Sequence, residues 1–410
     1  MKEAILVINA GSSSLKFSIF LTDAGEKNKV TKNLDLLSRG QIEGIGVHPS
    51  FVVKDDKGVI LAKNQWENSK DINHEFLLKY LIEWLDQNLQ GAKVKAAGHR
   101  VVHGGTEFTS SVLVTEDILI KLEKLIPLAP LHQTHNLAAI KALKKVYPDL
   151  PQVACFDTSF HTTNPDVLRH FFIPRELEEN EGIKRYGFHG LSYEYIAETL
   201  KQMDPELAQK RVLIAHLGSG SSMCAMKEGQ SVTTSMGLTA LDGLPMGTRP
   251  GAMDPGVVLY LMKEKKMTPD QIENLLYYKS GLLGLSGISN DMRQLQESDS
   301  PRALLTMEAF AWKVCQMIGS LAATIQGMDA LVFTAGIGEN SPRVRKIIVE
   351  KLSWMGVLLN EEANENKTDL SRKDRFGSFL INSLQSKVKV YVIPTNEELM
   401  IAKHVLKESL

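Results

Sequence analysis

The chain has 410 residues, of which 43% are hydrophobic and 23% charged, and its formal net charge is -1. This length favours two domains with ample core, and the balanced charge gives no overall field for nucleic acid or an anionic membrane. The longest apolar runs are too short for a membrane span or a signal peptide, so we expect neither. Three widely spaced cysteines, Cys155, Cys224 and Cys315, indicate a reducing compartment, and we expect a cytoplasmic protein.

A strand predicted over residues 3–9 leads into a turn of small residues, Gly-Ser-Ser-Ser at 11–14, followed by Lys16. Such a turn leaves backbone N–H groups and hydroxyls open to phosphate oxygens. A diverged copy returns at 212–226, where the turn reads Gly-Ser-Gly at 218–220. Because the copies lie about half a chain apart, they predict two related domains facing one nucleotide, and thus a phosphate-handling enzyme.

The first half carries two charged candidates next to predicted strands. The pattern predicts strands over 38–62, 94–102 and 153–156, and helices over 75–89, 118–125 and 137–146. Arg100 follows Gly98 and His99 in a small-residue segment, where a planar guanidinium suits a carboxylate or phosphate or forms a structural ion pair. Asp157 ends a buried strand, where a carboxylate acts as base, metal partner or orienter, or caps the next turn.

The second half carries further candidates in glycine-rich segments. Helices are predicted over 257–262, 269–278 and 302–326, and strands over 330–334 and 388–393. His189 lies beside Gly187 and Gly190, which favours exposure to a ligand, although a lone histidine is more often structural. Arg249 lies in a rigid Gly/Pro-rich loop, a good mount for an arginine that meets developing charge. Residues 334–341 read as strand, Gly-x-Gly and helix, which suits a nucleotide without matching a dinucleotide or Walker fingerprint.

The C-terminal segment predicts a final helix that could return to the first domain. Thr395 is the expected N-cap, and Glu398 completes a capping box. From the internal repeat we expect one domain over 1–157, joined by the helix 394–410, and a second domain over 158–393. Zinc is disfavoured, because the pairs His99/His103 and His132/His135 have no cysteine at ligand spacing.

Seven segments, taken together and in order, resemble the acetate kinase family of acyl-phosphate-forming kinases over nearly the whole chain. They are Val7 to Lys16, Gly98 to Gly105, Phe156 to His161, Arg185 to Gly190, His216 to Gly220, Thr334 to Asn340 and Pro394 to Glu398.

The resemblance implies an α/β fold, the duplicated two-domain ribonuclease H-like fold of actin, the Hsp70 ATPase and sugar kinases, with ATP in the interdomain cleft. It also implies a cytoplasmic homodimer. The implied reaction is the reversible transfer of a phosphoryl group from ATP to acetate, giving ADP and acetyl phosphate. The implied cofactor is Mg²⁺, with Mn²⁺ as a substitute.

The resemblance also implies a role for each site residue. Asp157, His189 and Arg249 match catalytic residues, and Asn9 and Glu397 match metal ligands. Arg100 would bind the substrate carboxylate, with Val102, Leu131 and Phe188 forming a small apolar pocket. The nucleotide contacts would be Lys16, His216, Leu217, Gly218, Ser219, Gly220, Asp291, Met292, Arg293, Gly336, Ile337, Gly338, Glu339 and Asn340.

The sequence departs from the commoner family pattern at Ala240, where many members have proline, and at residues 133–135, where Gln-Thr-His replaces an Asn-Pro pair. Both changes leave open whether acetate or propionate is the preferred acid. Two readings from other classes also remain: an actin- or Hsp70-like nucleotide switch that binds partners, and a sugar kinase of the same superfamily.

Overall fold

The computed structural model describes residues 2–11, 14–23, 34–45, 47–66, 72, 74–89, 91–365, 374 and 376–409. Ser12 and Ser13, in the first predicted phosphate turn, lie outside these residues. The chain divides into two compact units: unit 1 comprises residues 1–159 and 396–410, and unit 2 comprises residues 160–395. No helix in the described ranges combines the length and apolarity needed to cross a membrane.

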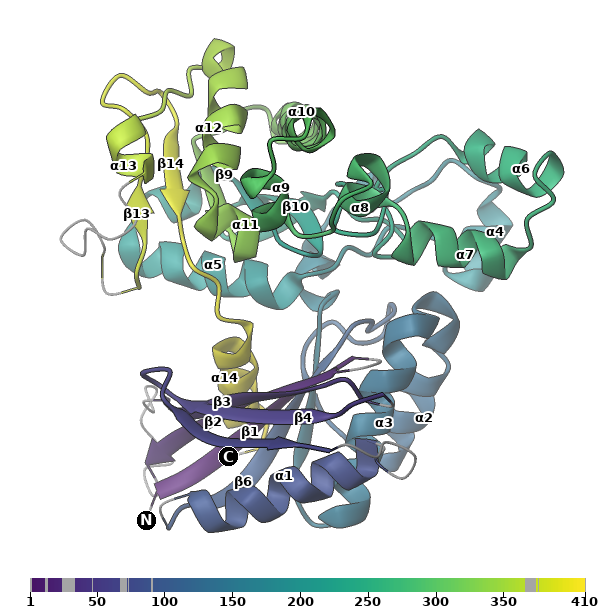
Figure 1. Ribbon diagram of the computed structural model, residues 1–410, viewed down its shortest axis with the longest axis vertical. Coiled ribbons are helices and arrows are strands. Elements are labelled where there is room, and N and C mark those ends of the chain that lie inside the picture. The colour runs from purple at the N-terminus through teal and green to yellow at the C-terminus, as the bar shows by residue number, and fades with distance from the viewer. Residues whose placement is uncertain are drawn as a thin grey trace. The chain divides into compact units, whose positions relative to one another are not determined.

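Unit 1 is built on a mixed sheet whose described strands have the order β5-β4-β3-β2-β1-β6-β8-β7 (Figure 1). The strands are β1 (Lys2–Ala10), β2 (Ser14–Asp23), β3 (Asp35–Glu43), β4 (Ser50–Asp55), β5 (Ile60–Gln65), β6 (Lys93–Val101), β7 (Val112–Leu113) and β8 (Gln152–Phe156). The helices are α1 (His74–Asn88), α2 (Glu116–Glu123), α3 (Pro130–Val146) and α14 (Glu397–Ser409). Parallel pairing of β1, β6 and β8 brings their carboxyl ends to one edge.

Alternation along β6 decides which side chains reach which helix. Ala97 and Val101 join the hydrophobic clusters formed with α1 and α3. Gly98 faces the other side of the sheet, where α14 presents Ile401 and Val405. Because the side-chain period of a strand is two, Arg100 shares the α14 side with Gly98. Figure 1 shows α14 lying with the strands of unit 1, although the preceding strand belongs to unit 2.

Unit 2 contains a second mixed sheet with the order β11-β10-β9-β12-β14-β13 among the described strands. They are β9 (Arg211–Leu217), β10 (Ser221–Lys227), β11 (Gln230–Thr234), β12 (Ala330–Thr334), β13 (Phe379–Leu380) and β14 (Lys389–Val392). The helices are α4 (Arg175–Glu181), α5 (Gly190–Met203), α6 (Pro255–Lys263), α7 (Pro269–Tyr278), α8 (Gly281–Ser286), α9 (Met292–Glu297), α10 (Pro301–Thr324), α11 (Ala335–Asn340), α12 (Pro342–Lys351) and α13 (Glu361–Glu365). Apolar residues of α10 and α12, among them Phe310 and Ile348, form one core with β9, β12 and β14.

The two sheets repeat one topology. In each, an antiparallel hairpin is followed by parallel strands, β1-β2-β6-β8 in unit 1 and β9-β10-β12-β14 in unit 2. Ile8 pairs with His99, and Ala215 pairs with Phe333. Asn9 and His216 each lie two residues before the glycine that follows their strand, so their positions are equivalent. The residues before them, Ile8 and Ala215, are then equivalent too. Their partners on the next strand are each followed by the residue of interest, so Arg100 is equivalent to Thr334. The sequence repeat is therefore a structural repeat.

Several predicted element boundaries were wrong. Thr395 is not the N-cap of the last helix: Asn396 accepts from the Leu399 backbone N–H at 3.0 Å through its side chain, so no capping box with Glu398 forms. Helix α3 begins at Pro130 instead of residue 137, because proline suits the first helical turn. Residues 334–341 were predicted as strand, Gly-x-Gly and helix, and the Gly-x-Gly segment itself lies within the short helix α11. Helix α5 was not predicted.

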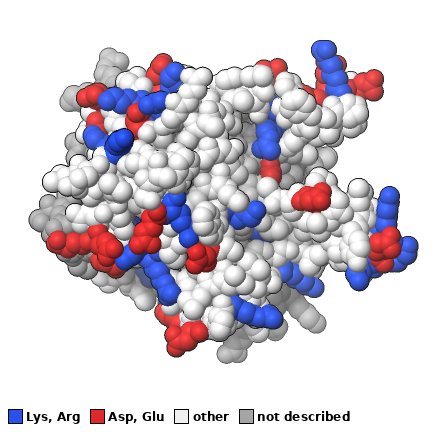
Figure 2. All heavy atoms as spheres, turned by 90° about the horizontal axis from the view of Figure 1, so that it is seen from above, with Lys and Arg blue, Asp and Glu red and all other residues white. Residues whose placement is uncertain are grey.

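Acidic and basic side chains are intermixed on the face shown in Figure 2, which agrees with the formal net charge of -1. That face carries no broad surface of one sign. Figure 2 therefore gives no support for electrostatic attraction of nucleic acid to this side of the molecule.

Replacing Gly98 by alanine should destabilise unit 1. A Cβ at this position would lie 2.4 Å from Ile401 Cγ2 and 2.6 Å from Val405 Cγ2, so α14 would have to move away from β6. We expect Gly98→Ala to cost about 1–3 kcal/mol in the free energy of unfolding, measured by urea titration. Gly319→Ala in α10 is the control, because nothing lies within 4 Å of its Cβ and alanine favours helix. Equal stability of the two variants would contradict this account of the contact.

Buried histidines should make the fold sensitive to acid. Burial lowers the pKa of His99, His103 and His161 from 6.5 to about 4. Between these values the unfolded chain binds protons that the folded protein does not, so stability is complete above pH 6.5 and falls as the pH falls towards 4. A histidine whose pKa falls from 6.5 to about 4 on folding contributes about 3 kcal/mol to the free energy of unfolding at neutral pH, and this contribution is lost in acid.

The measurement is the free energy of unfolding as a function of pH, by urea titration between pH 7.5 and 4.5. His99→Leu should make the curve shallower by the titration of one group, whatever it does to stability at pH 7.5. The exposed His170 has a pKa raised by its hydrogen bond to Glu178, so His170→Gln should not make the curve shallower. Parallel curves for wild type and His99→Leu would exclude His99 as a source of acid lability.

Candidate functional site

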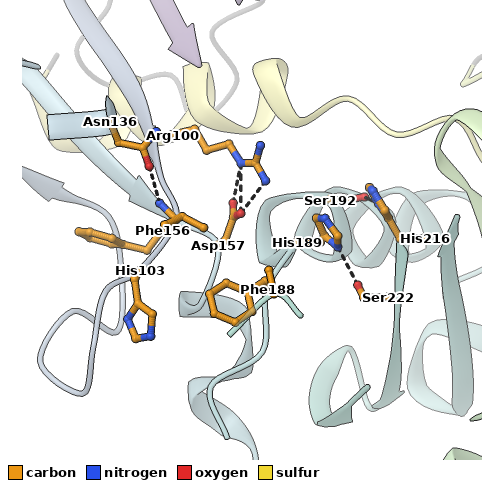
Figure 3. Close-up of polar contacts among 12 residues, drawn as sticks. Arg100, His103, Asn136, Phe156, Asp157, Phe188, His189, Ser192, His216 and Ser222 are labelled. Atoms are coloured by element: carbon orange, nitrogen blue, oxygen red, sulfur yellow. Dashed lines mark hydrogen bonds and ion pairs between the residues drawn. The ribbon is translucent and has the colours of Figure 1, made fainter. Parts of the chain in front are cut away.

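Arg100 and Asp157 form a bidentate ion pair in unit 1 (Figure 3). Arg100 Nε donates to Asp157 Oδ1 at 2.9 Å, and Nη2 donates to Oδ2 at 2.6 Å. The pairing of β6 with β8 places Arg100 opposite Cys155, and the Asp157 N–H donates to the Val101 carbonyl at 3.1 Å. Asp157 is buried, whereas the Arg100 side chain stays 24% exposed. The pair therefore fixes the guanidinium and leaves part of it accessible to a second anion.

Further charges gather around this pair at the start of α14. Burial by itself would lower the pKa of Arg100, but the carboxylates of Asp157 and Glu397 outweigh it and raise the pKa, so the guanidinium stays charged. Burial is also the main reason that the pKa of Glu397 is raised to about 7. Asp157 and Glu398 raise it further, while Arg100 and Lys16 oppose the shift. This edge of unit 1 thus holds three acidic groups and two basic groups within electrostatic reach.

A buried amide network holds the backbone beside Arg100. The Asn136 side chain, on α3, accepts from the Val102 N–H at 3.0 Å and donates to the Ala10 carbonyl at 2.7 Å (Figure 3). One turn earlier, Gln133 accepts from the His103 N–H at 3.2 Å and donates to the His103 carbonyl at 3.1 Å. These bonds join the end of β1 to the segment after β6, so they fix Asn9 and Arg100 relative to one another.

In unit 2, His189 lies at a strained point before α5. Its φ is +60°, in the left-handed region that non-glycine residues seldom adopt. Gly187 precedes it with φ +82°, and a Cβ there would lie 2.4 Å from Thr234 Cγ2 and 2.7 Å from His161 Cδ2. The buried His161 Nε2 contacts the Phe188 carbonyl at 3.0 Å, which makes it the donor. Packing and hydrogen bonds therefore determine where the His189 side chain points.

The His189 ring stacks on His216, with ring centroids 4.2 Å apart and an interplanar angle of 15°. Each ring has a serine on its Nδ1 atom, Ser222 at 2.8 Å for His189 and Ser192 at 2.8 Å for His216 (Figure 3). His216 is the second-last residue of β9, and His189 immediately precedes α5. The stacked pair thus joins one ring from strand β9 to one ring from the residue before helix α5.

The loop carrying Arg249 is held by backbone bonds from two sides. Residues at the start of α8 donate to the carbonyls of residues 246–248, for example Leu282 N–H to Met246 O at 2.9 Å. The Gly247 N–H donates to the Ser219 carbonyl at 3.0 Å, and Arg249 Nη1 donates to Ala240 O at 2.8 Å. A Cβ placed on Gly220 would lie 3.2 Å from His189 Nε2 and 3.5 Å from Arg249 Nη2. His189 and Arg249 therefore converge on the second glycine-serine turn.

A pocket of about 660 Å³ opens beside this turn within unit 2. Its walls are Gly218 and Ser219 of the turn, residues 290–293 and Gln296 at α9, and Gly336, Ile337, Asn340 and Ser341 at α11. Asp291 caps α9 through the Arg293 N–H at 2.9 Å and pairs with the Arg293 side chain. The size is within the usual range for ligand pockets, and glycines in the wall permit close backbone approach.

The structure groups the predicted residues into two sets. Unit 1 holds Asn9, Lys16, Arg100, Val102, Leu131, Asp157 and Glu397, and unit 2 holds Phe188, His189, Arg249 and the remaining nucleotide candidates. Of the nucleotide candidates, Gly218, Ser219, Asp291, Met292, Arg293, Gly336, Ile337 and Asn340 line the pocket. Gly338 and Glu339 instead give their carbonyls to the buried Arg345, at 2.9 and 3.0 Å. These two residues reinforce α11.

The sequence did not predict the buried residues that hold the site residues in place through hydrogen bonds. Asn136, Ser192, Tyr193 and Ser222 are buried and bond to site residues or to the backbone between them. The apolar spacing Leu191, Tyr195, Ile196 and Leu200 could have revealed α5, and with it the face carrying Ser192 and Tyr193. Nothing in the local sequence marks Asn136 as a link between two strands.

Comparisons with known proteins place this architecture among acyl-phosphate kinases. The profile of the Acetokinase family matches residues 4–403. The chain is 47% identical over 404 residues to an acetate kinase of Nitrobacter hamburgensis, covering 98% of this chain and 96% of that one. It is 43% identical to an acetate kinase of Rickettsia felis, covering 99% and 100%.

Two solved structures agree along nearly the whole fold. A propionate kinase of Francisella tularensis has 37% identity and a TM-score of 0.87, with 98% of each chain covered. An acetate kinase of Porphyromonas gingivalis has 33% identity and a TM-score of 0.85, with 99% of each covered. These similarities extend over the site residues and both units. The chain belongs to the Acetokinase family.

Proposed function

We propose that the protein catalyses the reversible transfer of the γ-phosphoryl group of ATP to acetate, giving acetyl phosphate and ADP. Membership of the Acetokinase family over nearly the whole chain carries the proposal. The geometry supports it, because unit 1 has an oriented arginine for a carboxylate and unit 2 has a glycine-lined pocket for a nucleotide. A pure nucleotide switch would have no evident use for the Arg100–Asp157 pair.

Arg100 binds the substrate carboxylate, with Val102, Leu131 and Phe188 around its short apolar tail. Acetate is already ionised at neutral pH, so one carboxylate oxygen can attack the γ-phosphorus without a general base. Asp157 is then an orienting group for Arg100, as the hydrogen bonds from Nε and Nη2 of Arg100 to its carboxylate support. His189 and Arg249 donate to the oxygens of the transferring group, where charge spreads in the transition state.

The nucleotide occupies the pocket beside Gly218 and Gly336, with its phosphates near the glycine-serine turn. The candidate contacts outside the pocket wall, Lys16, His216, Leu217 and Gly220, belong to the two turns or the strands beside them. Lys16 is close enough to Glu397 to affect the pKa of that group, so it can serve both phosphate and carboxylate.

Asn9 and Glu397 are the proposed ligands of Mg²⁺, which Mn²⁺ could replace. Among the described residues no three His, Cys, Asp or Glu side chains form a closed metal site. Mg²⁺ commonly takes one or two protein oxygens and completes its shell with waters and substrate phosphates, so an amide and a carboxylate are a fitting donor set. When bound, the ion neutralises phosphate charge.

A homodimer is part of the proposal, and helix α6 offers a face for it. None of its nine residues is buried, although four of them have large apolar side chains. These four are each more than 40% exposed: Val257, Leu259, Tyr260 and Met262. An apolar helix with this exposure in one copy gains stability by packing against a second copy. The three cysteines are all buried, and their wide spacing in the sequence supports a reducing, cytoplasmic location.

The test of the activity is acyl hydroxamate formation with magnesium-ATP, hydroxylamine and acetate, propionate or butyrate in separate reactions. We expect acid-dependent product, highest with acetate. One methylene changes binding by only about 1–3 kcal/mol, so propionate should also react. A higher kcat/KM for propionate would reassign the substrate. Absence of product with every acid, alongside intact ATP binding, would exclude the kinase and favour the switch or the sugar kinase.

Asp157→Asn should lower kcat/KM for acetate by roughly 100-fold, because it leaves the partly buried Arg100 without its counter-charge and without the carboxylate that orients it. The assay is the same hydroxamate reaction at saturating Mg²⁺. Asp329→Asn is a matched control, because Arg211 binds Asp329 through Nε and Nη2, both at 2.8 Å. This pair is half-buried and lies at the start of β9, away from the glycine-serine turn that follows that strand. That control should retain turnover. Near-normal turnover of Asp157→Asn would remove Asp157 from the mechanism.

A further inference from the structure

We propose that the hydroxyl chain Tyr193–Ser222 positions His189 by setting its tautomer, so that Nε2 carries the hydrogen offered to the transferring phosphoryl group. This inference deepens the proposed function and rests on it for the role of His189. Tyr193 and Ser222 are positioning residues, because they act on the reaction through the imidazole.

The chain of contacts is continuous and buried. Ser222 Oγ lies 2.8 Å from His189 Nδ1 (Figure 3). The Tyr193 hydroxyl makes a short hydrogen bond to the same Ser222 oxygen. Tyr193 and Ser222 have no solvent exposure. Water therefore does not compete for these groups, and a hydrogen bond in such surroundings is stronger than in solvent.

Local structure explains how the three groups meet. Tyr193 follows His189 by four residues, and its N–H donates to the His189 carbonyl at 3.1 Å, so both belong to the first turn of α5. Residues four apart share one face of a helix. Ser222 comes from β10, where it pairs with His216. Stacking on His216 fixes the plane of the His189 ring, and Ser222 fixes its rotation within that plane.

The number of hydrogens that each group can donate decides the direction of the hydrogen bonds from Tyr193 through Ser222 to His189. Phosphoryl oxygens only accept, so the ring nitrogen that meets them must carry a hydrogen. Nε2 is the nitrogen near Gly220 and Arg249, and in a neutral imidazole Nδ1 is then an acceptor. Ser222 must donate its single hydrogen to Nδ1, and its oxygen receives the hydrogen of Tyr193. Tyr193 thus donates to Ser222, Ser222 donates to His189 Nδ1, and His189 Nε2 donates to the phosphoryl group.

The His216 ring also has a serine on Nδ1, but that serine contacts a threonine instead of a tyrosine. Ser192 Oγ lies 2.8 Å from His216 Nδ1 and 2.9 Å from Thr395 Oγ1. Two stacked rings with centroids 4.2 Å apart cannot both become positive without strong repulsion. This repulsion disfavours a second positive charge in the pair, and a serine on each Nδ1 adds no negative charge that would offset the repulsion.

The test combines NMR with kinetics on the full-length protein. Nitrogen-15 labelling of the histidines reports which ring nitrogen carries hydrogen, and His189→Gln identifies the His189 signals. We expect the Nε2–H tautomer in wild type and a tautomer mixture in Ser222→Ala. Ser231→Ala is the control, because Ser231 makes the same kind of bond to His161 Nδ1 at 2.8 Å and should leave His189 unchanged.

In the hydroxamate assay, Ser222→Ala should lower kcat about tenfold with the KM values for acetate and magnesium-ATP within about twofold, the size expected for one lost hydrogen bond. Tyr193→Phe should act in the same direction with a smaller effect, and Ser222→Thr, which keeps the hydroxyl, should retain the tautomer. If wild-type His189 carries its hydrogen on Nδ1, or if Ser222→Ala leaves the tautomer and kcat unchanged, the proposal is wrong. An inactive wild type with the Nε2–H tautomer would instead refute the proposed function alone.

Discussion

The close contact between β6 and α14 at Gly98 is the constraint on which the charge cluster of unit 1 depends. A glycine here lets Ile401 and Val405 approach the strand, and the first turn of α14 then brings Glu397 within electrostatic reach of Arg100. Strand alternation puts Arg100 on that same side. A helix at the far end of the sequence thus completes a set of charges whose other members lie within the first 157 residues.

The two units use different physical means to hold their functional groups. Unit 1 relies on opposite charges, with the Arg100–Asp157 pair and Glu397 under partial burial. Unit 2 holds its histidines by ring stacking and by hydrogen bonds to serine hydroxyls, beside a glycine-lined pocket, and holds the charged Arg249 through a backbone carbonyl. An oriented ion pair is suited to binding a carboxylate, and several directional N–H donors are suited to a phosphoryl group whose charge is spread over several oxygens.

Much of this organisation could be predicted from local sequence. The duplicated α/β fold and the acetate kinase resemblance were predicted and are confirmed, because small-residue turns after strands and a long-range repeat are visible without a structure. The capping box at Thr395 was predicted wrongly, since Asn396 competes for the same role one residue later. The roles of Asn136 and Ser222 could not be found, because they come from contacts between segments far apart in the chain, whereas Tyr193 lies on a helix that the apolar spacing could have revealed. The roles of the individual site residues stay predictions.

The repeated strand order has a consequence for how the chain diversified. Arg100 in unit 1 corresponds to Thr334 in unit 2, a buried threonine, and Asn9 corresponds to His216. The same scaffold positions therefore carry a cation and a candidate metal ligand in one copy, and small or aromatic neutral groups in the other. The two halves therefore share one backbone plan, and the difference between their chemistry comes from the side chains that each half places at these equivalent positions.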